Sequence, residues 1–147
     1  MNVRSTTFSR KRFSVFELFV AVVVGAFILS IFFIFVESVR TRSRDTRREQ
    51  DIKQLQTALN LYQANHRRFP ICDPVNLIDR CLIPLVTEGA MPTLPTDPLH
   101  ESVGICEAEG SHVYCYKSAR GSSYDLYYNL ETDTILGKSA GWQRVSS

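Results

Sequence analysis

The feature that most constrains this chain is a run of 19 residues, Leu18–Val36, without a single charged side chain. The run is rich in Phe and β-branched residues. At 1.5 Å per residue, a helix of this length crosses the hydrocarbon core of a bilayer. A cleavable secretory signal has a shorter apolar core followed by small residues, whereas "ESVRTRSRDTRR" follows here. The sequence therefore predicts a retained transmembrane helix over residues 13–36.

A glutamate, Glu17, lies at the beginning of this apolar segment. A carboxylate at membrane depth costs about 2.5–3.5 kcal/mol on insertion scales and needs a cationic or hydrogen-bonding partner. One interpretation is that Glu17 serves association with another molecule inside the membrane. The other is that it lies at the headgroup level and pairs with a basic residue of the preceding segment, Arg10, Lys11 or Arg12.

Basic residues flank the span on both sides. Four precede it and five follow it (Arg4, Arg10, Lys11 and Arg12; Arg40, Arg42, Arg44, Arg47 and Arg48). The positive-inside rule therefore gives nearly a tie. The even number of cysteines, all after the span, suits an oxidising compartment. We expect a cytoplasmic N-terminus, a single membrane pass and an extracytoplasmic C-terminal head.

The four cysteines form two pairs of equal C-x8-C spacing. We favour two local disulfides, Cys72–Cys81 and Cys106–Cys115, over the other two connectivities or free thiols. Zinc held by the cysteines with His100 or His112 is the alternative, but structural zinc sites have C-x2–4-C spacing instead.

Helical character continues beyond the membrane segment. Residues 37–66 contain neither Gly nor Pro, and Ile52, Leu55, Leu59 and Tyr62 recur on one helical face beside Ala58. Pro70 disfavours helical geometry at the residue before it. We therefore expect an amphipathic extension over 37–66 that ends near residues 65–67.

The remaining residues, 67–147, indicate a small β-rich head. Five of the six prolines fall between residues 74 and 98, which indicates a turn-rich connection. Strand patterns follow at 112–118, 122–131 and 134–138, the second with Tyr and Leu alternating along one face. The expected fold is α+β: a basic leader (1–12), a long helix, and a disulfide-stabilised antiparallel sheet packed against the helix's second half.

Two function classes find no support in the sequence. It contains no metalloprotease, P-loop, nucleophile-elbow or dinucleotide-binding motif, so we predict that the protein is not an enzyme. The arginines of residues 40–48 lack the interleaved aromatics of a nucleic-acid stacking platform, and such a run is more often a solvated, ion-paired helix face. We therefore do not expect nucleic acid as a partner.

The order of motifs resembles the type IV pilin and type II secretion pseudopilin superfamily, in particular the major pseudopilins. The resemblance rests on Phe13-Ser14-Val15-Phe16-Glu17-Leu18 ahead of the apolar run, on "DIKQLQTALNLYQANHRRFP", and on "LPTDPL" before a tyrosine-rich sheet. It covers residues 10–130. It implies a filament subunit that polymerises through its N-terminal helix, with an inner-membrane assembly platform and a prepilin peptidase as partners and membrane lipid around it before assembly.

The same resemblance assigns roles to particular residues. It implies cleavage before Phe13, methylation of the new Phe13 amine, and pairing of Glu17 with the N-terminal amine of a neighbouring subunit. Family members have Gly before the cleaved bond, whereas this sequence has Arg12. The alternative is therefore an uncleaved, single-pass anchored binding module that does not polymerise.

Major pseudopilins bind calcium in C-terminal loops, so the resemblance also names Asp125, Glu131 and Asp133 as weak calcium candidates near a turn. The sequence contains no EF-hand pattern. No other cofactor is expected.

Overall fold

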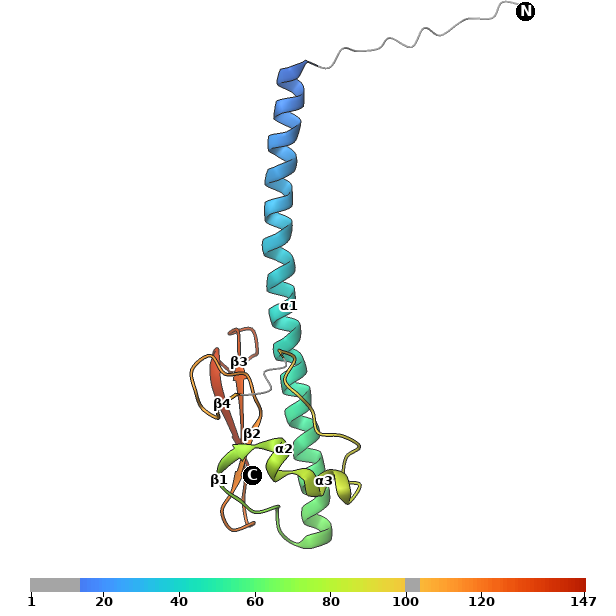
Figure 1. The fold of residues 1–147 in the computed structure, drawn as a ribbon, viewed down its shortest axis with the longest axis vertical. Helices are drawn as coiled ribbons and strands as arrows, with labels where there is room; N and C mark the ends of the chain where they lie inside the picture. The colour runs from blue at the N-terminus through green and yellow to red at the C-terminus, as the bar shows by residue number, and fades with distance from the viewer. Residues whose placement is uncertain (1–13, 100–103) are drawn as a thin grey trace, which may run out of the picture. The chain divides into compact units, whose positions relative to one another are not determined.

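The computed structural model describes residues 14–99 and 104–147, and it confirms the predicted α+β class. Helix α1 is the longest element, and the others follow it along the chain (Figure 1). They are α1 Val15–His66, β1 Cys72–Leu77, α2 Ile78–Cys81, α3 Ile83–Thr87, β2 Cys115–Ser118, β3 Asp125–Leu130 and β4 Gly141–Ser146. The chain divides into two compact units within α1, residues 1–38 and residues 39–147. We call the second of these the head unit.

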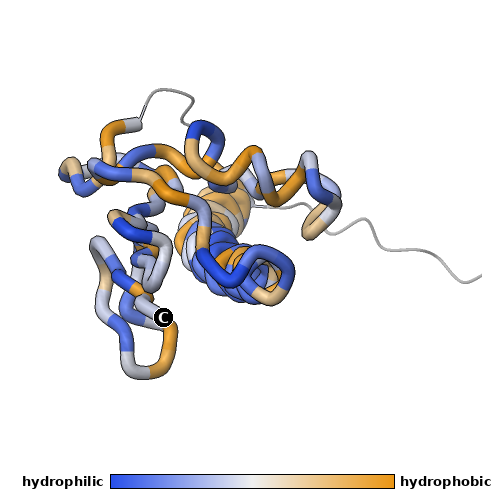
Figure 2. Tube along the Cα trace, turned by 90° about the horizontal axis from the view of Figure 1, so that it is seen from below, coloured by the Kyte–Doolittle hydropathy of each residue, from blue (hydrophilic) through white to orange (hydrophobic). Residues whose placement is uncertain are grey.

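The described part of the first unit is the apolar part of α1. This helix is long and apolar enough to cross a membrane, and its most hydropathic window has no buried residue. The change of character along α1 is visible in Figure 2, where the nearer turns are largely hydrophilic and those behind them largely hydrophobic. One segment of the chain thus meets the requirements of a single-pass membrane anchor.

The part of α1 in the head unit contributes one face to a hydrophobic core. Ile52, Leu55, Ala58 and Leu59 are at most 3 % exposed, and Tyr62 is partly buried against the same core, which confirms the predicted apolar stripe. The helix ends at His66, and Arg67 follows with a left-handed φ of 58° while its N–H donates to the carbonyl of Gln63. Such a residue after the last helical turn is a common helix C-terminus.

The sheet is antiparallel, with strand order β1-β2-β3-β4 following the chain. Alternate residues of β3 and the residue before it enter the core, as the sequence pattern predicted: Tyr124, Leu126, Tyr128 and Leu130. Tyr114 and Tyr116, and Leu82 and Leu85 from the α2–α3 region, belong to the same core. The strands lie beside the second half of α1 in Figure 1.

Two of the predicted strands are confirmed in shortened form, and one is wrong. Strand β2 begins at Cys115 and β3 at Asp125. Residues 134–138 form a turn in which Gly137 has a φ of +78°. The last strand is β4 instead, which pairs with β3 from Asp125↔Ser146 to Leu130↔Gly141.

Strand β1 was also missed by the sequence patterns. It contains Pro74, which cannot donate to a strand ladder and is tolerated on an edge. The sheet order places β1 at an edge, where it pairs with β2 around an irregularity between Cys72 and Asn76.

Candidate functional site

Glu17 lies in the first turn of α1, directly after a helix cap formed by Ser14. The carbonyl of Ser14 accepts the N–H of Leu18 at 3.1 Å, and its Oγ accepts the N–H of Phe16 at 3.3 Å. Ser14-Val15-Phe16-Glu17 is the S-x-x-E spacing of a capping box, with Glu17 at its third helical position. A carboxylate there also favours the helix dipole. Glu17 can therefore support the helix N-terminus, in addition to the predicted pairing with the N-terminal amine of a neighbouring subunit, which would set the register between subunits.

A shallow groove runs along the same face of α1. It is lined by Phe16, Glu17, Val20, Ala21, Val24, Gly25 and Ile28. Ala21 and Gly25 are four residues apart, and nothing in the described structure lies within 4 Å of a Cβ placed on Gly25. Small residues at this spacing allow another helix backbone to approach closely in a membrane. Arg12 and Phe13, the predicted cleavage position, lie outside the described residues.

The head unit contains a buried ionic network centred on Arg48, whose side chain is fully buried. Its Nε and Nη2 donate to Asp97 at 2.7 and 2.9 Å, and its Nη1 donates to Asp45 at 2.8 Å and to Glu131 at 2.6 Å. Arg44 donates to both oxygens of the same glutamate, at 2.8 and 2.6 Å. Two arginines thus pair with three carboxylates. The network joins α1 to the segment around Asp97 and to the turn that contains Glu131.

Asp45 caps the turn that follows β3. Its carboxylate oxygens accept the backbone N–H groups of Glu131 and Thr132, at 3.0 and 2.9 Å, and the Thr132 hydroxyl at 2.7 Å. The prediction that the arginine run is a solvated face is therefore wrong for Asp45 and Arg48. They lie on the buried side of α1, where the sheet and the segment around Asp97 cover them.

Electrostatics favour the charged forms of Glu131 and Arg48 in this network. Hydrogen bonds from Arg44 outweigh burial, and together with Arg48 they lower the pKa of Glu131 to about 2. Burial lowers the pKa of Arg48, but hydrogen bonds to Asp97, Glu131 and Asp45 outweigh it, so the pKa lies above its usual value. A buried arginine with several carboxylate partners is strongly bound to them, and its removal leaves uncompensated charge.

Three further polar contacts attach the sheet and the residues next to its strands to α1. The Tyr114 hydroxyl donates to Asp51 at 2.9 Å, and burial raises the pKa of both groups. The Tyr128 hydroxyl donates to Glu49, and the same glutamate accepts Lys138 at 2.6 Å. The acids that alternate with arginines along α1 are thus attachment points for the sheet.

Both local disulfides are present with the pairing favoured from the sequence, Cys72–Cys81 and Cys106–Cys115. The first connects β1 to α2, and the second connects β2 to the loop that precedes it. Sulfur atoms bonded to each other are not thiolates, so the zinc interpretation is wrong for this state of the cysteines.

The three calcium candidates do not come together. Asp125 begins β3, where Arg144 donates to both its oxygens at 2.9 Å and Ser146 donates at 2.6 Å. Glu131 follows the other end of that strand, and Asp133 accepts the N–H of Ala140. The expectation that they share a turn is wrong for Asp125, because a full strand separates it from the others. Across residues 14–99 and 104–147, no group of three or more His, Cys, Asp or Glu could hold a metal ion.

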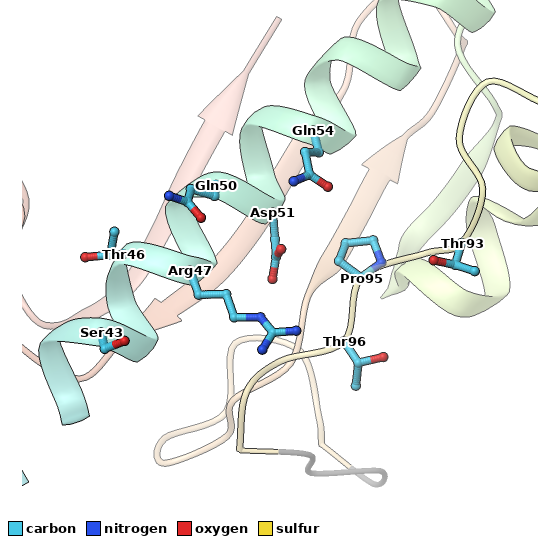
Figure 3. A pocket seen from close by; sticks show the side chains of 9 residues that line it. All are labelled: Ser43, Thr46, Arg47, Gln50, Asp51, Gln54, Thr93, Pro95 and Thr96. Carbon is cyan, nitrogen blue, oxygen red and sulfur yellow. The ribbon is translucent and has the colours of Figure 1, made fainter.

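A polar groove of about 620 Å³ lies between α1 and the segment that ends at Asp97. Figure 3 shows its lining: Ser43, Thr46, Arg47, Gln50, Asp51 and Gln54 from the helix, and Thr93, Pro95 and Thr96 from the facing segment. Arg47 and Asp51 both point from α1 into this space. Sequence reasoning identified neither this groove nor the Arg48 network.

One sequence signal could have found the network. The apolar stripe at Ile52, Leu55 and Leu59, extended backwards at helical spacing, reaches Arg48 and then Asp45. Charged residues on a core-facing stripe indicate a buried ion pair. Their partners, Asp97 and Glu131, could not be inferred from spacing.

Comparison of the chain with protein-family models, with curated proteins and with solved structures found no match.

Proposed function

We propose that this chain is a pilin-like structural subunit of a type IV pilus-like or type II secretion pseudopilus filament. It would enter the membrane through the first part of α1, with the N-terminus cytoplasmic and the head unit outside the cytoplasm. Polymerisation would then exchange lipid contacts of the apolar helix for contacts with the helices of other subunits.

The observation that carries this proposal is the composition of α1. Its first part exposes a long apolar surface, and the same helix continues into the core of a disulfide-containing head. The sequence motif around Phe13 and Glu17 and the tyrosine-rich sheet support it. The disulfides suit an oxidising location for the head.

The groove beside Glu17 supports the step at which helices associate. Ala21 and Gly25 offer a close approach, and Glu17 borders the same groove. A carboxylate on a helix face in lipid favours a cationic partner. In the proposed filament that partner is the N-terminal amine of the neighbouring subunit.

Arg12 supports a second function, an anchored binding module that is not cleaved and does not polymerise. The polar groove lined by Arg47 gives such a module a surface for a ligand. N-terminal sequencing of the full-length protein, recovered from membranes and from sheared surface material, separates the two. A start at Phe13 together with filaments in electron micrographs is the result expected for a pilin. A start at Met1 without filaments would overturn the pilin function and support the anchored binding module.

Glu17 is tested by three substitutions assayed for insertion and for filament formation. Glu17→Ala and Glu17→Gln should both abolish filaments while membrane insertion persists. Gln retains the side-chain hydrogen bonding of a capping box but lacks the charge. Ser14→Ala, which removes the cap alone, serves as the control and should leave filaments in place. Filaments with Glu17→Gln but not with Glu17→Ala would assign Glu17 to helix capping instead.

A further inference from the structure

The lining of the polar groove along α1 contains one cationic side chain, Arg47, whose hydrogen-bond donors are not used by the described residues of the head unit. Arg44 and Arg48 form ion pairs with the carboxylates of the buried network. Arg47 is exposed and forms no hydrogen bond or ion pair with any described residue. Figure 3 shows its guanidinium extending from α1 towards the segment that contains Thr96.

The other groups of the groove suit a polar occupant. Four hydroxyls, from Ser43, Thr46, Thr93 and Thr96, and two amides, from Gln50 and Gln54, line it. Asp51 is the acid of the groove, but it is buried and accepts the Tyr114 hydroxyl. Burial raises the pKa of Asp51, and the charge of Arg47 acts to lower it by less, but no hydrogen bond joins the two side chains. Such a lining suits a peptide segment that bears a carboxylate. The carboxylate would pair with Arg47, and the peptide groups would form hydrogen bonds with the hydroxyls and amides.

The head unit itself presents such a segment. Residues 106–110, "CEAEG", contain two carboxylates and no basic side chain, and both Glu107 and Glu109 are exposed. Glu109 forms no hydrogen bond or ion pair with a described residue. Another exposed acid, Asp79, is next to Arg80 in sequence and so offers a less acidic surface. We call residues 106–110 the acidic loop.

The acidic loop is held firmly in place. Cys106 is bonded to Cys115 of β2, and the Trp142 indole donates to the carbonyl of Ala108 at 2.8 Å. The Ala108 N–H donates to the carbonyl of Ile105, and the Ser111 N–H donates to the carbonyl of Ala108, both at 3.3 Å. A pre-organised loop loses little conformational entropy when it binds.

We propose that the acidic loop of one copy docks in the polar groove of a second copy, with Glu109 paired to Arg47. The loop is anchored to β4, whereas the groove runs along α1, so the two surfaces differ. A contact between different surfaces of identical chains is heterologous and repeats from copy to copy unless the rotation closes a ring. The inference deepens the filament function and rests on it.

Charge exchange in the full-length protein tests this contact. A photo-crosslinking residue replaces Gln50 in the groove, and crosslinked peptides between copies are quantified by mass spectrometry in assembled material. Arg47→Glu and Glu109→Arg should each reduce crosslinks to residues 106–110 at least about fivefold, because like charges then face each other. The double variant should recover to within about twofold of the unchanged pair. Arg42→Glu, an equal charge change on an exposed arginine outside the groove lining, is the control and should have no effect.

A second crosslinker at Phe19, on the apolar part of α1, separates the two proposals. Phe19 crosslinks between copies without any from Gln50 to the acidic loop would overturn the docking inference and leave the filament function standing. No crosslinks between copies at either position would overturn both. Gln50 crosslinks to another segment, to lipid or within one chain, or a double variant that does not recover, would also overturn the docking contact.

Discussion

Arg48 and Asp97 form a buried, bidentate ion pair, in which Nε and Nη2 of the arginine donate to the two carboxylate oxygens at 2.7 and 2.9 Å. The aspartate is 49 positions further along the chain. Neither side chain is more than 3 % exposed. The pair attaches the proline-rich segment to α1 and thereby forms one wall of the polar groove.

Removal of Arg48 is expected to destabilise the head unit severely. Arg48→Ala leaves Asp45 and Asp97 buried without their cation, which typically costs about 3–5 kcal/mol of unfolding free energy. Denaturant unfolding of the full-length protein in detergent, followed by near-UV circular dichroism, measures this. Arg40→Ala, on an exposed turn of the same helix, should change the unfolding free energy by less than about 0.5 kcal/mol. Equal effects of the two substitutions would contradict the role assigned to Arg48.

The head unit should lose stability in acid through Glu131. Its pKa is lowered from 4.5 to about 2 in the folded state, so its contribution is complete above about pH 5 and is lost as the pH falls towards 2. Between pH 7 and pH 3 the wild type should lose about 2 kcal/mol more unfolding free energy than Glu131→Gln. Asp125→Asn should alter this pH dependence less, because its partner Arg144 is mostly exposed. Parallel pH profiles for wild type and Glu131→Gln would argue against the ionic contacts of Glu131.

The Tyr114 hydroxyl should contribute measurably to stability. Tyr114→Phe removes the donor that serves the buried Asp51, at an expected cost of about 1–3 kcal/mol. The matched control is Tyr127→Phe, because the Tyr127 hydroxyl has no hydrogen bond to a described residue. Thermal unfolding of both variants provides the comparison. If the two melt at the same temperature, the Tyr114–Asp51 bond does not stabilise the fold.

The pairing of the two disulfides and the contribution of each to stability can be tested separately. Peptide mapping without reduction should recover Cys72 linked to Cys81 and Cys106 linked to Cys115. Replacing either pair by serine or alanine should cost about 2–3 kcal/mol, the size expected for short loops. Loss of the second pair should additionally loosen the acidic loop, seen as faster proteolysis after Glu107 or Glu109. Mixed linkages in the peptide map would contradict this pairing.

Local patterns in the sequence predicted the helical part of the fold well. The absence of Gly and Pro from residues 37–66 and the stripe at Ile52, Leu55 and Leu59 predicted a helix to residues 65–67, and α1 ends at His66. The alternation along β3 predicted its buried face. These signals are local, since helix and strand periodicity depend on neighbours within a few residues.

The sequence patterns did not predict strands β1 and β4, because these strands form by pairing with β2 and β3. Residues 72–77 contain a proline and read as a turn, and they become a strand because β2 lies alongside. Residues 134–138 have the better strand composition, but they form the turn that leads to β4, whose register with β3 includes Leu130↔Gly141. Strand propensity is weak compared with pairing and burial.

By itself, the sequence determined the apolar span, the length of α1, the core-facing stripe and the cysteine spacing, because each depends on periodicity or composition within a short segment. Only the tertiary structure decided which charges are buried. Arg48 and Arg47 are neighbours with the same side chain, yet one is fully buried among three carboxylates and the other is exposed in a groove. The difference arises because Asp97 and Glu131 return to one face of α1 from 49 and 83 positions away, and no local pattern encodes that return.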